Sequence, residues 1–221
     1  MQKFDTAAAI VTTLAVPAGR IRIIATDRTD TTVDIQPADS SKSRDVNTAR
    51  RTDVTYTDGV LRIEVPKTKS GILGDTGSIE VTVQLPAGSR VEAQAAAAEL
   101  TTTGRLGDVT FEGAYRQIRI DEAANLRLTA ADGDIEIGRL TGSADITTAR
   151  GDIHVAQALA GTVNLTTQKG DITLAAATGV SATLDAGTAY GRVTNSLKND
   201  GIPALSIRAT TSYGDITARS L

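Results

Sequence analysis

The chain has 221 residues, and its 23 Lys plus Arg against 26 Asp plus Glu give a formal net charge of −3. Because these charges nearly balance and neither half of the chain is basic, the composition gives no reason to expect a nucleic acid or an anionic membrane as partner. The chain has no cysteine and one histidine, which excludes disulfides, thiolate chemistry and metal centres built from several Cys or His ligands. Aromatic residues make up only 3%, so the core must consist of small and medium aliphatic side chains, and a thin β architecture is favoured.

Residues 1–90 are predicted to form an irregular β cap, continuous with the segment that follows and closing one end of it. Short apolar runs in this region are separated by Gly and Pro turn signals. The polar segment Ser40–Arg51 is expected to hold one short helix, and Lys67–Gly77 to form a flexible loop. The predicted strands are Ile10–Val16, Ile21–Ala25, Thr32–Gln36, Val54–Tyr56, Val60–Val65 and Ile79–Leu85.

No targeting segment is evident in the sequence. The apolar stretch Ala7–Val16 is short and interrupted by threonines, so it is interpreted as a strand rather than as a secretory signal. No apolar run approaches the roughly 18 residues that a membrane-spanning helix needs. As written, the chain is therefore expected in the cytoplasm, and outside the cell if a leader has been removed from it.

A repeated phrase, Gly-Asp-Ile, organises residues 91–221. Around it the chain divides into seven units that start 17 to 23 residues apart, each with two apolar pairs at a constant nine-residue spacing. Such a pattern predicts a single-stranded parallel β-solenoid, a form of β-helix, right-handed because parallel crossovers almost always are. An antiparallel meander of hairpins is the alternative. The phrase occurs at Gly133–Ile135, Gly151–Ile153, Gly170–Ile172 and Gly214–Ile216, with Gly191–Val193 as a variant.

The C-terminal coil is expected to form the open end of the solenoid. It spans Leu205–Ala218, and only Arg219, Ser220 and Leu221 follow to cover it. A strand edge left open in this way invites pairing with another chain. Weak end-to-end association through this coil, or assembly into a structural β-helix, is therefore an alternative to a monomer.

The sequence resembles a bacterial putative-adhesin domain family of β-strand repeats, a domain family of unknown function, and is similar to its actinobacterial members. The resemblance is carried by the Thr-x-x-Gly-Asp-Ile units, by the entry turn that begins at Leu85 with Leu-Pro-Ala-Gly-Ser, and by the closing segment Thr211–Thr217. It covers nearly the whole chain. It implies a β-solenoid without established enzyme activity, and it supplies neither catalytic residues nor a cofactor.

An aspartate precedes the second strand in several units, and Asp134, Asp152 and Asp171 are expected to stack about 4.8 Å apart. Like charges at that spacing need compensation, which a calcium ion could supply. The favoured interpretation is that each aspartate caps the amides of its own turn, because Arg150 and Lys169 lie beside two of the three and the calcium-roll signature is absent. A third interpretation treats Asp152 and Asp171 as the acids of a carbohydrate-active enzyme.

Two tyrosines, Tyr190 and Tyr213, occupy matching Tyr-Gly positions in late units, and Tyr115 lies in an earlier one. They are candidates for a small aromatic shelf that contacts a ligand or partner, although such rings more often cover glycine-rich turns. His154 is expected to point outward beside Glu136 and Thr173, without a catalytic role.

The sequence therefore predicts a non-enzymatic binding or scaffold protein. Its partner, a protein or a carbohydrate, is left open, and no cofactor is expected. The alternatives are the carbohydrate-active enzyme and the self-assembling structural protein.

Overall fold

The computed structural model describes residues 1–66, 77–115 and 117–221. Most of the expected loop Lys67–Gly77 lies outside these residues, as does the side chain of Tyr115. The structure is all-β, with 69% strand and 4% helix, in an open sheet. It divides into two compact units, Met1–Tyr115 and Arg116–Leu221, which are taken in turn.

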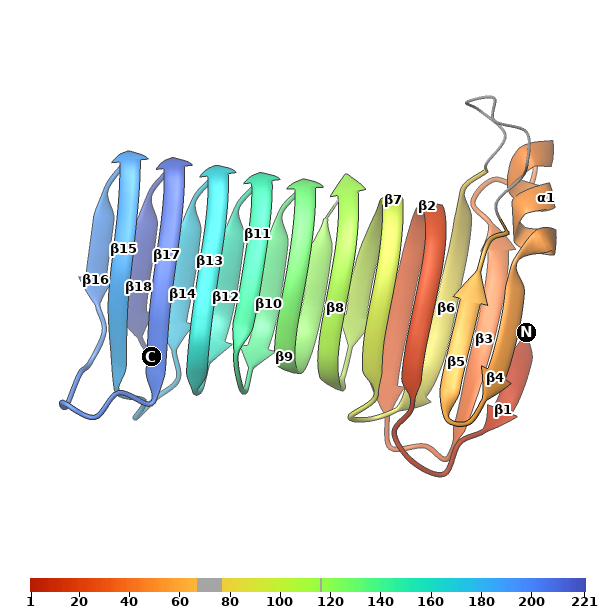
Figure 1. Cartoon of the computed structure of the whole chain (residues 1–221), viewed down its shortest axis with the longest axis horizontal. Coiled ribbons are helices and arrows are strands. Elements are labelled where there is room, and N and C mark those ends of the chain that lie inside the picture. Colours follow the sequence, from red (N-terminus) through yellow and green to blue (C-terminus); the bar gives the residue numbers. More distant parts are fainter. Residues whose placement is uncertain (67–76, 116) are drawn as a thin grey trace. The chain divides into compact units, whose positions relative to one another are not determined.

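The first unit is built around two long strands, β2 and β7, that pair in parallel along their length (Figure 1). The early part of β2 also pairs with β5, and its later part, from Gly19, with β6. The two strands expected at Ile10–Val16 and Ile21–Ala25 are thus one bent strand. The elements are β1 (Gln2–Asp5), β2 (Val11–Thr26), β3 (Asp30–Pro37), α1 (Ser43–Arg51), β4 (Asp53–Thr57), β5 (Val60–Glu64), β6 (Ile79–Pro86), β7 (Arg90–Thr103) and β8 (Arg105–Tyr115).

Three pairs of this unit, β1–β3, β3–β6 and β4–β5, are antiparallel. The sheet is therefore mixed, and these antiparallel pairs lie within residues 1–90, the region predicted to form an irregular β cap. One physical reason lies in the turn between β4 and β5, where Asp58 and Gly59 both have positive φ, 51° and 78°. Two successive residues with positive φ favour a tight hairpin, which reverses the chain. The outermost strands β1 and β4 are bridged by Phe4 and Tyr56, whose ring centroids lie 5.5 Å apart.

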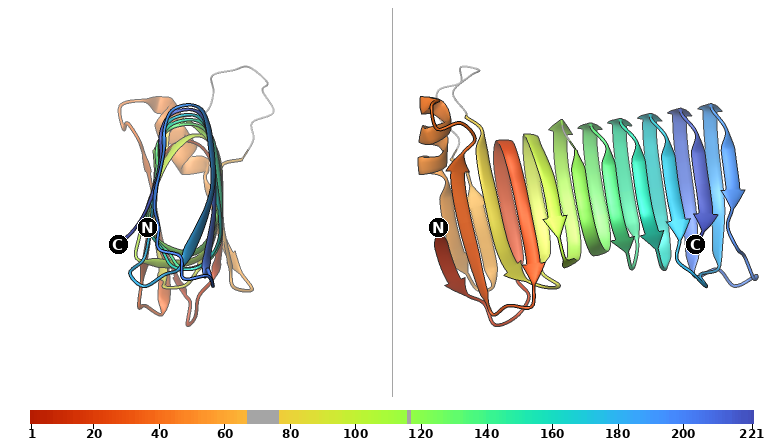
Figure 2. Two further views of the ribbon diagram at one scale, coloured as in Figure 1. Left: turned by 90° about the vertical axis from the view of Figure 1, so that its left-hand side faces the viewer. Right: turned by 180° about the vertical axis from the view of Figure 1, so that it is seen from behind.

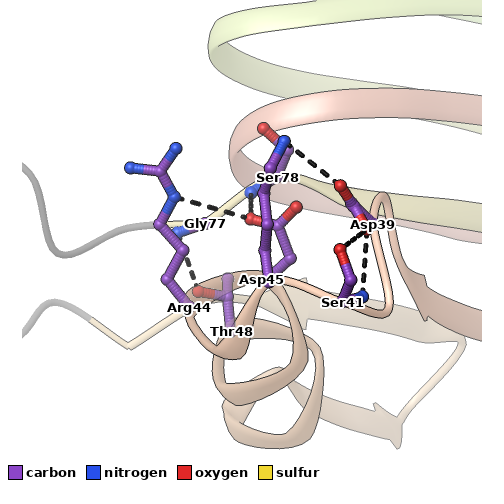
Figure 3. A network of polar contacts seen from close by, with 8 residues as sticks. Asp39, Ser41, Arg44, Asp45, Thr48, Gly77 and Ser78 are labelled. Atoms are coloured by element: carbon purple, nitrogen blue, oxygen red, sulfur yellow. Dashed lines mark hydrogen bonds and ion pairs between the residues drawn. The ribbon is translucent and has the colours of Figure 1, made fainter.

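Helix α1 lies within the predicted segment Ser40–Arg51, which confirms the expected helix. Two buried polar side chains attach it to the residues just before β6 (Figure 3). Oδ1 of Asp45 accepts the amide N–H of Ser78 at 3.0 Å, and Oγ1 of Thr48 accepts that of Gly77 at 2.9 Å. Because these side chains satisfy buried backbone donors, they hold the helix against the sheet.

In the second unit, every strand pair is parallel. Its strands form coils of two strands joined by a Gly-Asp turn, and seen end-on these coils superimpose as a flattened ring (Figure 2). The strands are β9 (Ile118–Asp132), β10 (Ile135–Leu140), β11 (Ala144–Arg150), β12 (Ile153–Ala158), β13 (Gly161–Lys169), β14 (Ile172–Ala176), β15 (Ala182–Tyr190), β16 (Val193–Ser196), β17 (Leu205–Tyr213) and β18 (Ile216–Ser220).

The coils of this unit do not stack in sequence order. One wall runs β9, β11, β13, β17, β15, and the other runs β9, β10, β12, β14, β18, β16. The C-terminal coil, β17–β18, is thus inserted between β13–β14 and β15–β16 (Figure 1). The expectation that Leu205–Ala218 forms the open end is wrong, because β15–β16 occupies the last position. Sequence order is the usual rule for repeats, and the long connection after β16 permits this exception.

The apolar pairs of the repeat turn inward and form columns, and in the column of the second wall every member but Val193, at 42% exposed, is buried. Isoleucines from successive coils pair in register at the start of the second wall, and all are at most 1% exposed. Full burial of such a side chain contributes about 1.5–3 kcal/mol. The column consists of Ile118, Ile135, Ile153, Ile172 and Ile216.

Candidate functional site

The aspartate column forms a ladder of hydrogen bonds between coils. Oδ1 of Asp134 accepts the amide N–H of Asp152 at 2.9 Å, and Oδ1 of Asp152 accepts that of Asp171 at 2.7 Å. In the same way, Oδ1 of Asp171 accepts the amide N–H of Asp215 at 2.7 Å, and Oδ1 of Asp215 accepts that of Arg192 at 2.8 Å. Each aspartate therefore caps an amide, but in the neighbouring coil and not in its own turn as expected. These amide donors hold successive carboxylates about one coil apart.

The glycine before each aspartate is required by the closeness of the coils. Gly151, Gly170 and Gly214 have φ of 129°, 151° and 149°. A Cβ added at these positions would lie 2.0–2.2 Å from a glycine carbonyl oxygen of the neighbouring coil. Both the positive φ and the contact exclude other residues.

In two copies of the Thr-x-x-Gly-Asp phrase, the threonine adds a hydrogen bond to a glycine carbonyl oxygen of the neighbouring coil. Oγ1 of Thr167 donates to the carbonyl oxygen of Gly151 at 3.1 Å, and Oγ1 of Thr211 donates to that of Gly170 at 3.0 Å. In a third copy of the phrase, Oγ1 of Thr148 donates instead to the carbonyl oxygen of Arg150 in its own turn, at 3.1 Å. Among the described residues, no three His, Cys, Asp or Glu side chains form a group that could hold a metal ion.

On the first wall, beside this turn, lies a different column of side chains. In register across the coils it contains Asp132, Arg150, Lys169, Tyr213 and Tyr190. Arg150 forms an ion pair with Asp132 at 3.1 Å, whereas within the described chain Lys169 has no ion pair. We call Arg150, Lys169, Tyr213 and Tyr190 the tyrosine ladder.

The two tyrosines that sequence analysis selected are stacked on each other. Their ring centroids lie 4.9 Å apart with 4° between the ring planes. Both remain open to solvent, with 67% of Tyr190 and 55% of Tyr213 exposed. The two stacked rings therefore form a small exposed aromatic surface on this wall.

A shallow groove of about 330 Å³ runs beside the tyrosine ladder. Its lining combines an aromatic ring with two cationic side chains and with amide and hydroxyl groups. The lining residues are Ala149, Arg150, Gln168, Lys169, Ser212 and Tyr213. The arrangement can stack on a ring and donate several hydrogen bonds, and it contains no evident nucleophile paired with a base.

His154 is exposed and lies in register between Glu136 and Thr173, as predicted. Glu136 in turn accepts from Nε of Arg119 at 2.8 Å and from Nε2 of Gln117 at 3.0 Å. The bond from Arg119 is the main reason that the pKa of Glu136 is lowered. These contacts join neighbouring coils on the outer surface of the second wall.

A groove that sequence analysis missed lies in the first unit. It encloses about 400 Å³ over β2, β5, β7 and β8, with an apolar floor between the exposed side chains of Glu64 and Glu112. The alanine run in β7 and the proline at the bend of β2 are the signals that could have indicated it, because small side chains on neighbouring strands leave a hollow. Its lining residues are Ala15, Val16, Pro17, Glu64, Val65, Pro66, Gln94, Ala95, Ala96 and Glu112.

These features define an all-β repeat protein whose repeated motif maintains the stacking of coils. The chain belongs to the Toastrack DUF4097 family, whose model matches residues 13–220. This is a bacterial domain family of unknown function, as the sequence resemblance implied. No curated protein matches the chain significantly. In the part of the chain that the structure describes, no helix is both long and apolar enough to cross a bilayer.

Several solved structures share the fold at low sequence identity. A putative adhesin from Parabacteroides distasonis is 13% identical, with a TM-score of 0.52, and the match covers 98% of this chain and 95% of that one. A putative adhesin from Bacteroides fragilis is 16% identical, with a TM-score of 0.41 and the same coverage. A putative lipid binding protein from Parabacteroides distasonis is 13% identical, with a TM-score of 0.42, again over 98% and 95% of the two chains. At these identities the likeness shows the fold alone.

Proposed function

We propose that the protein is a non-enzymatic binding protein that contacts a glycan through the tyrosine ladder and its groove. The observation that carries this proposal is the stacked, exposed pair Tyr190–Tyr213 next to Lys169, which forms no ion pair among the residues that the structure describes. Aromatic rings give sugar rings an apolar surface to stack on, while nearby polar side chains bond to hydroxyl or carboxylate groups. Neither tyrosine is needed to close the core, because the inward positions of their strands are filled by aliphatic side chains.

The repeat geometry supports an extended ligand. Arg150, Lys169, Tyr213 and Tyr190 are spaced by one coil each, about 4.8 Å. A saccharide unit in a polymer is of the same order of length, so several side chains of the ladder can contact one chain at once. Affinity then comes from several modest contacts along a surface, as in other repeat proteins.

A non-enzymatic role is favoured over the carbohydrate-active alternative by the contacts of Asp152 and Asp171. One oxygen of each carboxylate is committed to an amide of the next coil. Glycoside hydrolysis needs a pair of carboxyl groups that flank the scissile bond, one of them free to give up a proton. The contacts of Asp152 and Asp171 with the amides of neighbouring coils support a structural role for this pair instead.

Glycan-array binding of the fluorescently labelled protein tests this proposal. We expect binding to a set of polysaccharides, weakened about tenfold in Tyr213→Ala because a ring contact of about 1.4 kcal/mol is lost. Tyr213→Phe is the matched control, since it keeps the ring, and it should bind like the parent. Lys169→Met should weaken binding to carboxylate-bearing glycans in particular.

Two results would count against the proposal. An array without any bound glycan would reject the ligand class. Binding that is unchanged in a Tyr190→Ala, Tyr213→Ala double variant would reject the site.

A further inference from the structure

The coil β15–β16 ends the stack of the second unit without a cover. Within the described chain, β15 pairs only with β17, and β16 only with β18. The outward backbone groups of both strands therefore have no strand partner beyond the first residue of β15, Ala182, whose N–H donates to the carbonyl oxygen of Lys198 at 2.9 Å.

The core is open at this coil as well. Val193 occupies the position that Ile216 holds in the adjacent coil, in register with it. Val193 is 42% exposed, whereas Ile216 is 1% exposed. Every residue of β16 is exposed, and Leu184 of β15 is half-buried although it continues an inward column. A cross-section of the hydrophobic interior is thus left in contact with water.

Strand β15 lacks the usual protections of an edge. Natural edge strands are very short or carry lysines, prolines or bulges that prevent pairing, and β15 has nine residues. Strand β15 has no lysine, arginine or proline, and its one charged side chain, Asp185, is paired with Arg208 at 3.2 Å. In the first unit, by contrast, the outermost strands β1 and β4 are bridged by the rings of Phe4 and Tyr56.

We propose that this end is a dimerisation surface, occupied by the same end of a second copy of the chain. The open end consists of two strand edges with a strip of core between them. One extended peptide would pair with only one of these edges. A second β15–β16 coil has two edges and a core strip at the same separation, so it covers all three parts at once.

The sequence of the terminal turn favours one direction of pairing. A further parallel coil would find no carboxylate at position 192 to accept its amide, of the kind that Asp215 offers to Arg192. Arg192 has no acceptor to offer, so the ladder of carboxylates stops there. A twofold axis perpendicular to the stack instead makes each edge meet a strand of opposite direction, and antiparallel pairing needs no such ladder. Because this contact uses the open end of both copies, the assembly stops at two chains.

Sedimentation velocity over a concentration series tests the proposal. The parent should rise from 22.9 kDa toward twice that mass as concentration increases from the micromolar to the millimolar range. Val193→Lys should weaken association at least about tenfold, because dimerisation would bury an unpaired charge facing its symmetry mate. Since Val193 is already 42% exposed, the lysine remains hydrated in the single copy and folding is preserved.

Thr194→Lys is the matched control. It adds the same charge at the next residue of β16, but its side chain projects from the outer face of the wall beside Thr217 and not toward the open end. Its association should stay within about twofold of the parent, the range expected of a neutral surface change. Thermal melts followed by circular dichroism confirm that both variants are folded.

Hydrogen exchange at low and high concentration locates the contact independently. We expect concentration-dependent protection of the amides in β15 and β16, and none in β11. A constant mass of one chain, a mass that grows beyond two chains, or equal weakening by both lysine variants would each overturn the proposal. None of these measurements depends on glycan binding, so either proposal can fail alone.

Discussion

The close stacking of the glycine column predicts that Gly170→Ala is strongly destabilising. A Cβ at this position would lie 2.1 Å from the carbonyl oxygen of Gly151 and 2.5 Å from its carbonyl carbon. The φ of 151° adds a strain of about 1–3 kcal/mol for a residue with a side chain. Separating the coils enough to admit the methyl group adds about 1–3 kcal/mol of overpacking.

That separation also stretches two hydrogen bonds between the coils. The bond from the amide of Asp171 to Asp152 is 2.7 Å long, and the bond from Oγ1 of Thr211 to the carbonyl oxygen of Gly170 is 3.0 Å long. Each is worth about 0.5–1.5 kcal/mol net, more where a charge takes part. We therefore expect a total loss of about 3–9 kcal/mol, a large part of the stability of an ordinary domain.

Urea denaturation followed by circular dichroism measures this loss, with Gly187→Ala as the matched control. Gly187 lies in β15, has no positive φ, and a Cβ there would meet no atom within 4 Å. The control should be neutral or slightly stabilising, because alanine reduces the freedom of the unfolded chain. Equal stability of the two variants, within about 0.5 kcal/mol, would refute the argument from close stacking.

Three further predictions concern other contacts. Asp171→Ala should cost about 1–2 kcal/mol in thermal or urea unfolding, while Asp171→Asn, which keeps an acceptor oxygen, should cost less than half as much. Thr48→Val should cost about 1–3 kcal/mol, because the buried amide of Gly77 loses its acceptor; a melt equal to that of the parent would contradict the role given to this hydroxyl. The hydrogen bonds from Ser41, with Lys42 nearby, lower the pKa of Asp39 to about 2. Its stabilising contribution is therefore present above pH 3.8, the value in the unfolded chain, and is lost as pH falls through about 2; an NMR titration midpoint near 4 would disprove it.

Much of the second unit was predictable because its pattern is local and repeated. The apolar columns follow from a two-residue alternation and a constant spacing, and the buried isoleucines confirm them. The adjacent positions of Tyr190 and Tyr213 followed from the same register. The placement of β17–β18 could not be predicted. Leu184 of β15 and Ile207 of β17 occupy equivalent apolar positions, so either coil fits next to β13–β14.

The first unit was harder to predict because its geometry depends on turns. Asp58-Gly59 and Pro17–Gly19 were both identified as turn signals, but one reverses the chain and the other only bends a continuing strand. Which of the two occurs is decided by the strands that are available for pairing on each side. The groove near Glu64 and Glu112 depends on those pairings, and so it was missed.

The insertion of β17–β18 has a consequence for biosynthesis. Before Leu205 and the residues after it have been synthesised, β17 is absent and β13 is the neighbour available to β15. Because β13 and β15 both pair in register with β17, these two strands can also pair with each other. If β15 pairs with β13 at that stage, the contact must open again to admit β17–β18. A C-terminal truncation that removes β17–β18 therefore deletes an inner layer of the stack and not its outermost coil.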